Sequence, residues 1–234
     1  MKKVSFIGAY DKTDLILCLA KILTTVGKKV LVVDTTINQK AKYVVPAINP
    51  TVSYITEFEE VDVAVGFDNF KAIKNYIGIS EEKELEYDYA LLDIDNGNTL
   101  ENFKIQPTED NYFVTGFDLY SLKKGLEAFN NLKETFKLTK ILFSKTMLKE
   151  EDDYLNFLSL GLKIVWKENR VYFPTENGDE SILAENQRLA KIKIKQLSQQ
   201  YKESLLYIAE EILKDVSNSQ LRRTMRIIER DKGV

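Results

Sequence analysis

Residues 4–20, VSFIGAYDKTDLILCLA, join an apolar run, a short loop and a second apolar segment, and this stretch decides the fold. The apolar residues before Gly8 predict a buried strand over residues 3–7. After the loop, apolar residues recur every three or four positions, which predicts a helix over about 12–26 that ends at Gly27. A strand that leads through a glycine loop into a helix is typical of α/β proteins.

The rest of the chain alternates between strand-like and helix-like segments. This order favours a single α/β domain with a doubly wound, mostly parallel sheet flanked by helices. We expect strands at residues 3–7, 29–34, 51–58, 61–67, 85–95, 111–116 and 140–145, and two short strands around a turn at Glu168-Asn169 within 162–174. We expect helices at residues 12–26, 68–78 (with Asp68 as N-cap and Gly78 as its end), 119–133, 147–160 and 181–215, and irregular structure over 35–50.

The loop after the first strand carries part of a phosphate-binding pattern. A P-loop reads G-x-x-x-x-G-K-[ST], because bare backbone must approach the phosphates while the lysine contacts them and the hydroxyl binds Mg²⁺. Lys12 and Thr13 match this pattern, whereas Phe6 and Asp11 stand at its two glycines. Lys12 and Thr13 are therefore candidate nucleotide and Mg²⁺ ligands, and the alternative is that they are ordinary residues of a first helical turn.

With this loop, the chain resembles the ParA/MinD group of P-loop ATPases, whose deviant loop reads K-G-G-x-G-K-[ST]-T. Gly8, Lys12 and Thr13 match the group's loop. The group's other loop positions are occupied by Ile7 in place of the signature lysine, Ala9 and Asp11 in place of glycines, and Asp14 in place of the last threonine. Further segments that resemble the group's strands and helices are residues 27–36, 87–95, 111–127 and 140–145. The resemblance implies a P-loop fold with a degenerate nucleotide site.

The resemblance also implies roles for residues beyond the loop. Asp34 and Asp93 end two strands and correspond to positions that hold Mg²⁺, so Thr13, Asp34 and Asp93 are the candidate metal ligands. A second aspartate of the group, which positions the attacking water, is replaced by Thr36, and a threonine cannot act as a carboxylate base. Pro174 corresponds loosely to a proline near the adenine, although a surface turn is the better interpretation there.

Aspartates beside the loop also bear on anion binding. The N-terminus of a helix attracts anions, and Asp11 and Asp14 place carboxylates where a phosphate would bind. A carboxylate about 4 Å from a phosphate charge costs roughly 1 kcal/mol in water and about 4 kcal/mol at an effective dielectric of 20. We therefore expect ATP and Mg²⁺ to bind weakly if they bind.

Ile7 bears on assembly. In the ParA/MinD group the signature lysine crosses a dimer interface to the partner's nucleotide, and an isoleucine cannot make that contact. The resemblance therefore argues against a dimer that forms only with bound nucleotide. A homodimer that does not depend on nucleotide is still open, and we expect protein partners.

Composition excludes several classes of function. The chain has 234 residues, a net charge of −3, one cysteine and no histidine. This argues against a globally basic nucleic-acid binder, a Cys/His metal site and a histidine-based catalytic triad. No apolar run is long enough to span a membrane, and the start of the sequence does not read as a signal peptide. We expect a cytoplasmic protein.

The last residues form a basic amphipathic segment. We divide the chain into a domain at residues 1–216 and a tail at 217–234, in which Leu221, Met225 and Ile228 would share one helical face. A short apolar face without Trp or Phe binds lipid weakly, so a protein contact is favoured over a membrane contact.

Two functions remain open from the sequence. The favoured one is a non-hydrolysing adaptor, a pseudo-ATPase that helps to organise a cellular assembly in division, partition, or pilus or flagellum placement. The alternative is a slow ATP-dependent switch of the same superfamily that uses Lys12, Thr13, Asp34 and Asp93. The single cysteine excludes an iron–sulfur reductase of the nitrogenase type.

Overall fold

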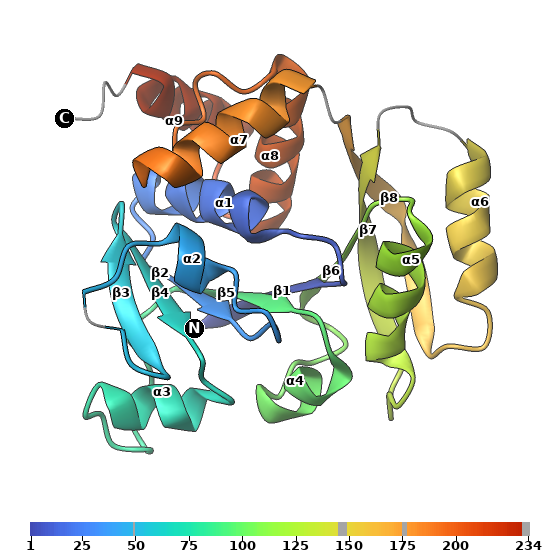
Figure 1. The fold of residues 1–234 in the computed structure, drawn as a ribbon, viewed down its shortest axis with the longest axis horizontal. Helices are drawn as coiled ribbons and strands as arrows, with labels where there is room; N and C mark the ends of the chain where they lie inside the picture. The colour runs from blue at the N-terminus through green and yellow to red at the C-terminus, as the bar shows by residue number, and fades with distance from the viewer. Residues whose placement is uncertain (49, 145–148, 175–176, 231–234) are drawn as a thin grey trace.

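A computed structural model describes residues 1–48, 50–144, 149–174 and 177–230, and within them the chain builds one eight-stranded sheet (Figure 1). The strands are β1 (Lys2–Ile7), β2 (Val30–Asp34), β3 (Tyr54–Phe58), β4 (Val61–Val65), β5 (Tyr89–Ile94), β6 (Asp110–Thr115), β7 (Phe136–Ser144) and β8 (Ile164–Pro174). Their order across the sheet is β3-β4-β2-β5-β1-β6-β7-β8. Every neighbouring pair is parallel except β3 and β4, which form an antiparallel hairpin at one edge.

Helices cover both faces of the sheet (Figure 1). They are α1 (Thr13–Thr25), α2 (Ala41–Val44), α3 (Phe70–Tyr76), α4 (Gly97–Asn102), α5 (Leu119–Leu126) with the 3₁₀ turn η1 (Glu127–Phe129), α6 (Lys149–Leu158), α7 (Asn177–Leu189), α8 (Gln199–Ile212) and α9 (Asn218–Arg230). Side chains of α1, α8 and α9 pack on one face of the sheet, and those of α3, α4, α5 and α6 pack on the other.

The central strands are buried on both sides, which is why they read as continuous apolar runs. All residues of β2, β5 and β6 are buried. Alternate residues of each strand therefore supply two cores, so that Phe6 packs beneath α1 while its neighbour Ile7 packs beneath α5. This doubly wound architecture confirms the predicted fold class.

Two predicted helix ends are confirmed by their backbone. Gly27 and Gly78 follow α1 and α3 with φ values of 94° and 72°, in the left-handed region that favours glycine. The predicted N-cap of α3 is wrong by one residue. Asn69, not Asp68, caps the helix, because the Asn69 side chain accepts a hydrogen bond of 2.9 Å from the Ala72 N–H.

The prediction of two short strands within residues 162–174 is wrong. These residues form the single strand β8, which pairs in parallel with β7 along its length, with an irregularity of register between Leu138 and Lys140. The polar residues Glu168 and Asn169 resembled a turn because β8 is an edge strand and exposes them to solvent. Strand β7 also starts earlier than expected, at Phe136, and so gives β8 a partner of sufficient length.

The predicted long helix over residues 181–215 is two helices. Helix α7 ends at Leu189, Ala190 takes a left-handed φ of 47°, and α8 begins after Ser198, whose side chain accepts a hydrogen bond from the Tyr201 N–H. Between the helices, Ile192, Ile194 and Leu197 are buried, so the apolar stripe continues through a segment that is not helical. The expected helix over 119–133 also ends early, at η1, and the short helices α2 and α4 were not expected.

Helix α9 packs onto the body of the protein beside α1 and α8 (Figure 1). Leu221, Met225 and Ile228 are buried in the same core as α1 and α8. Arg222 of α9 pairs with Glu203 of α8 at 2.9 Å. The apolar face that the sequence indicated is therefore occupied within the chain.

Candidate functional site

The carboxyl ends of three neighbouring strands, β1, β2 and β5, meet at one edge of the sheet and border a cavity of about 360 Å³. The β1–α1 loop and the segment after β2 complete its walls. The cavity is lined by Gly8, Ala9, Tyr10, Asp11, Lys12, Thr13, Thr36, Asn38, Lys40, Tyr43, Asp93 and Asp95. Ligands of open α/β sheets bind at this edge, and we call this space the loop cavity.

Lys12 lines the loop cavity, and its ammonium is already bound by other groups of the protein. Its ammonium lies 2.7 Å from an Asp93 carboxylate oxygen and donates a hydrogen bond of 2.8 Å to the Gly8 carbonyl. The Lys12 and Asp93 side chains are only 2% and 5% exposed. The lysine charge is thus neutralised where a phosphate-binding lysine would need to be available.

The pKa of the Asp93 carboxyl is raised to about 6, chiefly by burial; the Lys12 ammonium opposes the rise, and the Asp34 and Asp11 carboxylates add to it. The charged carboxylate form of Asp93 is disfavoured relative to the protonated form, because the buried surroundings of β5 solvate charge poorly. At neutral pH the Lys12–Asp93 ion pair is therefore the dominant form. In mild acid Asp93 takes up a proton and the ion pair is lost.

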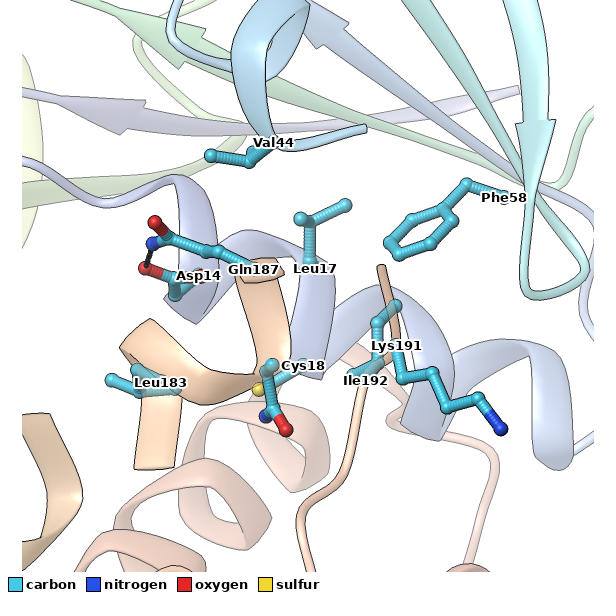
Figure 2. Close-up of a pocket in the computed structure, with 10 residues that line it drawn as sticks. Asp14, Leu17, Cys18, Val44, Phe58, Leu183, Gln187, Lys191 and Ile192 are labelled. Atoms are coloured by element: carbon cyan, nitrogen blue, oxygen red, sulfur yellow. Dashed lines mark hydrogen bonds between the residues drawn. The ribbon is translucent and has the colours of Figure 1, made fainter. Parts of the chain in front are cut away.

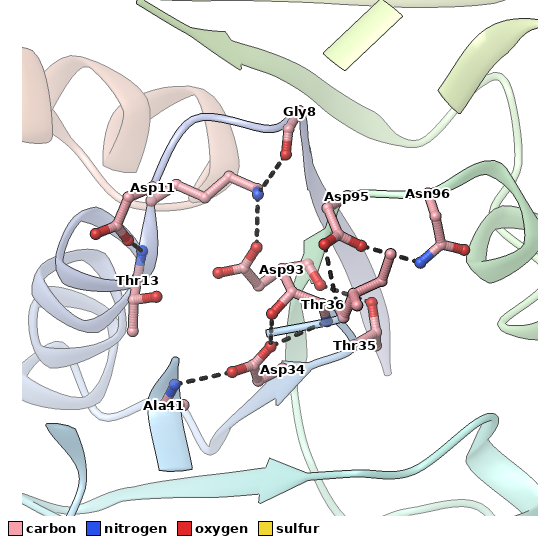
Figure 3. A network of polar contacts seen from close by, with 12 residues as sticks. Gly8, Asp11, Thr13, Asp34, Thr35, Thr36, Ala41, Asp93, Asp95 and Asn96 are labelled. Atoms are coloured by element: carbon pink, nitrogen blue, oxygen red, sulfur yellow. Dashed lines mark hydrogen bonds and ion pairs between the residues drawn. The ribbon is translucent and has the colours of Figure 1, made fainter. Parts of the chain in front are cut away.

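Asp34 faces Asp93 across the β2–β5 register, as the sequence suggested, but its oxygens are used locally. One oxygen accepts hydrogen bonds from the Thr36 N–H (3.0 Å) and hydroxyl (2.6 Å), and the other accepts one from the Ala41 N–H (2.9 Å) (Figure 3). Asp95 likewise accepts from the Ile37 N–H at 2.9 Å. These carboxylates hold the segment after β2 in place.

Asp11 occupies the start of α1. One of its oxygens accepts a hydrogen bond of 3.2 Å from the Thr13 N–H (Figure 3), and the other pairs with Lys40. Asp14 does not cap the helix: it accepts from Gln187 at 2.7 Å and lies 3.7 Å from Lys40. The helix N-terminus therefore already holds a carboxylate, as the prediction for Asp11 requires.

Gly8 and Ile7 are fixed by their backbone and their packing. Gly8 has a φ of 149°, and a Cβ there would lie 2.1 Å from the Val114 carbonyl oxygen, so only glycine fits. Ile7 is fully buried between Ile94 and Phe113 of the neighbouring strands. A residue at position 7 thus belongs to the core and does not reach the surface.

Pro174, a candidate nucleotide contact, ends β8 opposite Ser144. Strand β8 lies three strands from β1 in the sheet, and Pro174 is not among the residues that line the loop cavity. The other sequence candidates come together at the ends of β1, β2 and β5: Gly8, Lys12, Thr13, Asp34 and Asp93. Of these, Asp34 accepts hydrogen bonds from Thr36 and is not among the residues that line the loop cavity.

The structure adds residues that sequence reasoning missed. Lys40 bridges Asp11 and Asp14 from the segment after β2, and Thr35 donates a hydrogen bond of 2.6 Å to the Asp93 carbonyl. Tyr10 stacks on Phe143 at 4.7 Å between ring centroids. Each contact joins elements far apart in sequence, so no local pattern signals it.

The residues present are poorly suited to bind Mg²⁺ and a nucleoside triphosphate. The lysine is paired with Asp93, the Thr13 N–H is donated to Asp11, and both Asp34 oxygens accept backbone hydrogen bonds. Within the described parts of the chain, no group of three or more acidic, cysteine or histidine side chains is arranged to hold a metal ion. Phosphate binding would require these internal contacts to break.

No protein-family model matches the sequence, and no curated protein sequence matches it. Solved structures do. MinD of Aquifex aeolicus, in a cell-division complex with MinC, superposes with a TM-score of 0.58 at 12% identity, over 93% of this chain and 97% of that one. A putative plasmid partition protein of Borrelia burgdorferi bound to AMPPNP gives 0.57 at 15% identity, over 92% and 99% of the two chains.

A ParA family ATPase of Chlorobium tepidum gives a TM-score of 0.54 at 15% identity, over 87% of this chain and 96% of that one. In all three comparisons the likeness extends over nearly the whole of both chains. Structural matches at such low sequence identity show a shared fold and do not show a shared activity. The chain therefore has the fold of the ParA/MinD type of P-loop ATPases.

Proposed function

We propose that this protein is a ParA/MinD-fold adaptor that does not hydrolyse ATP and acts through protein contacts in the spatial organisation of a cellular assembly. The observation that carries the proposal is the buried Lys12–Asp93 ion pair, with the Lys12 ammonium also bound to the Gly8 carbonyl. Asp11 adds a carboxylate at the helix N-terminus. Together these contacts neutralise the groups that a nucleotide would need.

The proposed role in an assembly is supported by the solved structures to which this fold is similar. The similar structures include a MinC:MinD cell-division complex and a plasmid partition protein. We extend to this chain only the general theme of placing other components through protein contacts. A dimer, if one forms, would not depend on nucleotide, since Ile7 is buried in the sheet.

A specific observation favours a second candidate, a slow ATP-dependent switch. Lys12, Asp34 and Asp93 lie within the same strand-end cluster, and the loop cavity of about 360 Å³ is open beside them. Breaking the Lys12–Asp93 pair on binding would then be the slow step.

Calorimetric titration with ATP and MgCl₂, together with a phosphate-release assay, separates the two candidates. We expect no micromolar affinity and no turnover above background. Micromolar affinity combined with hydrolysis that Lys12→Ala abolishes would reject the adaptor in favour of the switch.

Two substitutions of Asp11 test why binding is weak. Asp11→Asn removes the charge and keeps an acceptor for the Thr13 N–H, whereas Asp11→Gly removes both. If charge is the obstacle, both variants bind MgATP more tightly than the parent protein. If occupation of the helix N–H is the obstacle, only Asp11→Gly does. Unchanged binding in both would contradict the account of Asp11 as a built-in anion.

A further inference from the structure

A second cavity, of about 250 Å³, lies on the other side of Tyr10, where the first turns of α7 approach the start of α1 and of α8. Four carboxylates and two tyrosines line it: Asp11, Asp14, Asp179, Glu180, Tyr10 and Tyr201. No lysine or arginine is among the described residues of its lining. We call it the acidic cavity.

The carboxylates of the acidic cavity are only partly neutralised. Lys40, outside the lining, pairs with Asp11 and lies 3.7 Å from Asp14. Asp179 accepts hydrogen bonds from the Ser198 N–H (2.6 Å) and hydroxyl (2.7 Å), which do not cancel its charge. Glu180 is exposed at the rim. The cavity therefore has a negative potential that repels anions and attracts cations.

The negative charge of the acidic cavity affects the pKa values of Tyr10 and Asp14, which line it. The pKa of the Tyr10 phenol is raised to about 12, chiefly by burial and further by the Glu180 and Asp11 carboxylates. Burial also raises the pKa of Asp14, with Asp11 adding to the rise while Lys40 opposes it. Both shifts are those of groups that share a confined, negatively charged space.

Tyr201 supplies an independent sign of a ligand. It is 3% exposed and lines the cavity, and the charged groups around its phenol, Asp14 and Asp179, line it too. Its backbone N–H donates to Ser198, but among the described residues no hydrogen bond reaches its hydroxyl. A bound N–H group can therefore donate a hydrogen bond to this hydroxyl from within the cavity.

Aromatic rings form the adjoining wall. Tyr10 stacks on Phe143 at 4.7 Å, Phe143 stacks on Phe173 at 4.9 Å, and Phe173 meets the edge of Tyr201 at 4.8 Å. Aromatic faces attract organic cations, and guanidinium groups in particular stack on them.

We propose that the acidic cavity binds the guanidinium group of a small organic cation or of an arginine side chain. A planar guanidinium carries donors for Glu180 and Asp14 and for the Tyr201 hydroxyl, and its face suits the Tyr10–Phe143 wall. The proposal is independent of the nucleotide question, although Tyr10 and Asp11 border both cavities.

A neighbouring hollow does not compete for the ligand. Where α7 crosses α1, Gln187 hydrogen-bonds Asp14 beside Leu183 and Cys18 (Figure 2). This hollow has a volume of only about 10 Å³, which is space for no more than one water molecule.

Calorimetry with butylguanidinium chloride tests the proposal, and butylurea is the control because it has a closely similar shape and no charge. We expect butylguanidinium to bind and butylurea not to bind. Affinity should also fall when ionic strength rises from about 0.01 M to about 0.15 M, because salt screens the carboxylates. Equal binding of the two probes, or no binding of either, would overturn the proposal.

Three variants locate the site. Glu180→Gln removes a rim charge and Tyr201→Phe removes only the hydroxyl, and each should weaken butylguanidinium binding about fivefold. Glu185→Gln, an exposed change on the same helix outside the lining, should leave binding unchanged. If neither Glu180→Gln nor Tyr201→Phe weakens binding, the proposed site is wrong.

Two further arms separate the source of the cation and the two cavities. A capped Gly-Arg-Gly peptide that binds more tightly than butylguanidinium indicates an arginine of a partner protein, and weaker binding indicates a free small molecule. Tyr43→Ala changes a 79% exposed residue that lines the loop cavity and not the acidic cavity, so it should leave butylguanidinium affinity unchanged. Loss of affinity in Tyr43→Ala would place the cation in the loop cavity and reject the acidic cavity, whatever the outcome with MgATP.

Discussion

At the residue scale, buried charge controls the edge of the sheet. The Asp93 carboxyl and the Lys12 ammonium face each other with almost no exposure to water, and Asp34 and Asp11 add negative charge nearby. Each of these groups changes what its neighbours can bind. Substitutions here should therefore alter pH dependence as well as stability.

The raised pKa of Asp93 predicts a pH-dependent contribution to stability. Its pKa rises from 3.8 to about 6, so the folded state holds the proton more tightly than the unfolded state does. The associated stabilisation is fully present below pH 3.8 and is lost as pH rises through 6. About two pKa units correspond to about 3 kcal/mol.

Asp93→Asn resembles the protonated side chain at every pH. Between pH 4.5 and 7 the free energy of unfolding of the parent protein should therefore fall relative to this variant, measured by urea unfolding. Lys12→Met removes the ammonium that lowers the Asp93 pKa, so an NMR titration of the carboxyl should move to higher pH. A difference between parent and Asp93→Asn that does not change with pH would contradict the assignment.

Gly8→Ala tests the close approach of β1 to β6. The new methyl group would meet the Val114 carbonyl at 2.1 Å, in a backbone conformation that suits only glycine. We expect a loss of at least about 2 kcal/mol in the free energy of unfolding. Gly178→Ala is the control, since its Cβ meets nothing within 4 Å in α7 and should be neutral or slightly stabilising. Equal effects of the two changes would show that the loop can relax.

At the element scale, the terminal helix α9 is a structural part of the fold. Its buried residues pack against α1 and α8, and its outer face carries arginines. None of the helices within the described residues has the length and apolar content to cross a lipid bilayer. The apolar stripe of α9 would have to leave its own core before it could meet another surface.

Leu221→Ala should lower the free energy of unfolding by about 2–4 kcal/mol, because it removes a buried side chain that is 1% exposed. Ile227→Ala on the same helix is 52% exposed and should change stability by less than about 0.5 kcal/mol. Denaturant unfolding of both variants measures the contrast. In the same account, co-sedimentation with anionic vesicles should not differ between the full chain and one ending at Val216. Strong binding that depends on the tail would revive a membrane role.

At the scale of the whole molecule, one sheet is shared by two cores, and each core contains a natural probe. Cys18, the single cysteine, is buried beneath α8, and Trp166, the single tryptophan, packs by Phe113 on the other face. The strands between the cores are common to both, so neither core can lose its packing while the other keeps it.

We therefore expect one cooperative transition in denaturant. Tryptophan fluorescence and the labelling rate of Cys18 should give the same midpoint. Cys18→Ala, followed by fluorescence alone, checks that labelling does not itself shift the transition. Separate midpoints for the two probes would indicate that the faces unfold independently and would contradict a single cooperative unit.

The sequence by itself determined the fold class and the places of the main strands. Continuous apolar runs such as residues 89–94 belong to strands buried on both sides, and Gly27 and Gly78 mark helix ends through their backbone freedom. It also located Gly8, Lys12, Asp34 and Asp93 near one sheet edge, because the carboxyl ends of parallel strands meet there. The local sequence pattern is enough to predict a conformation that depends on the residues of a single strand or helix.

Only the tertiary structure decided what those residues contact. The Lys12–Asp93 pair, the Lys40 bridge to Asp11, and the acidic cavity join residues that are 29 to about 190 positions apart, so their geometry depends on how the sheet and helices pack. The same reason explains the errors. Residues 162–174 form one strand because β7 offers a partner along its length, and 181–215 form two helices because Asp179 holds Ser198 at the start of α8.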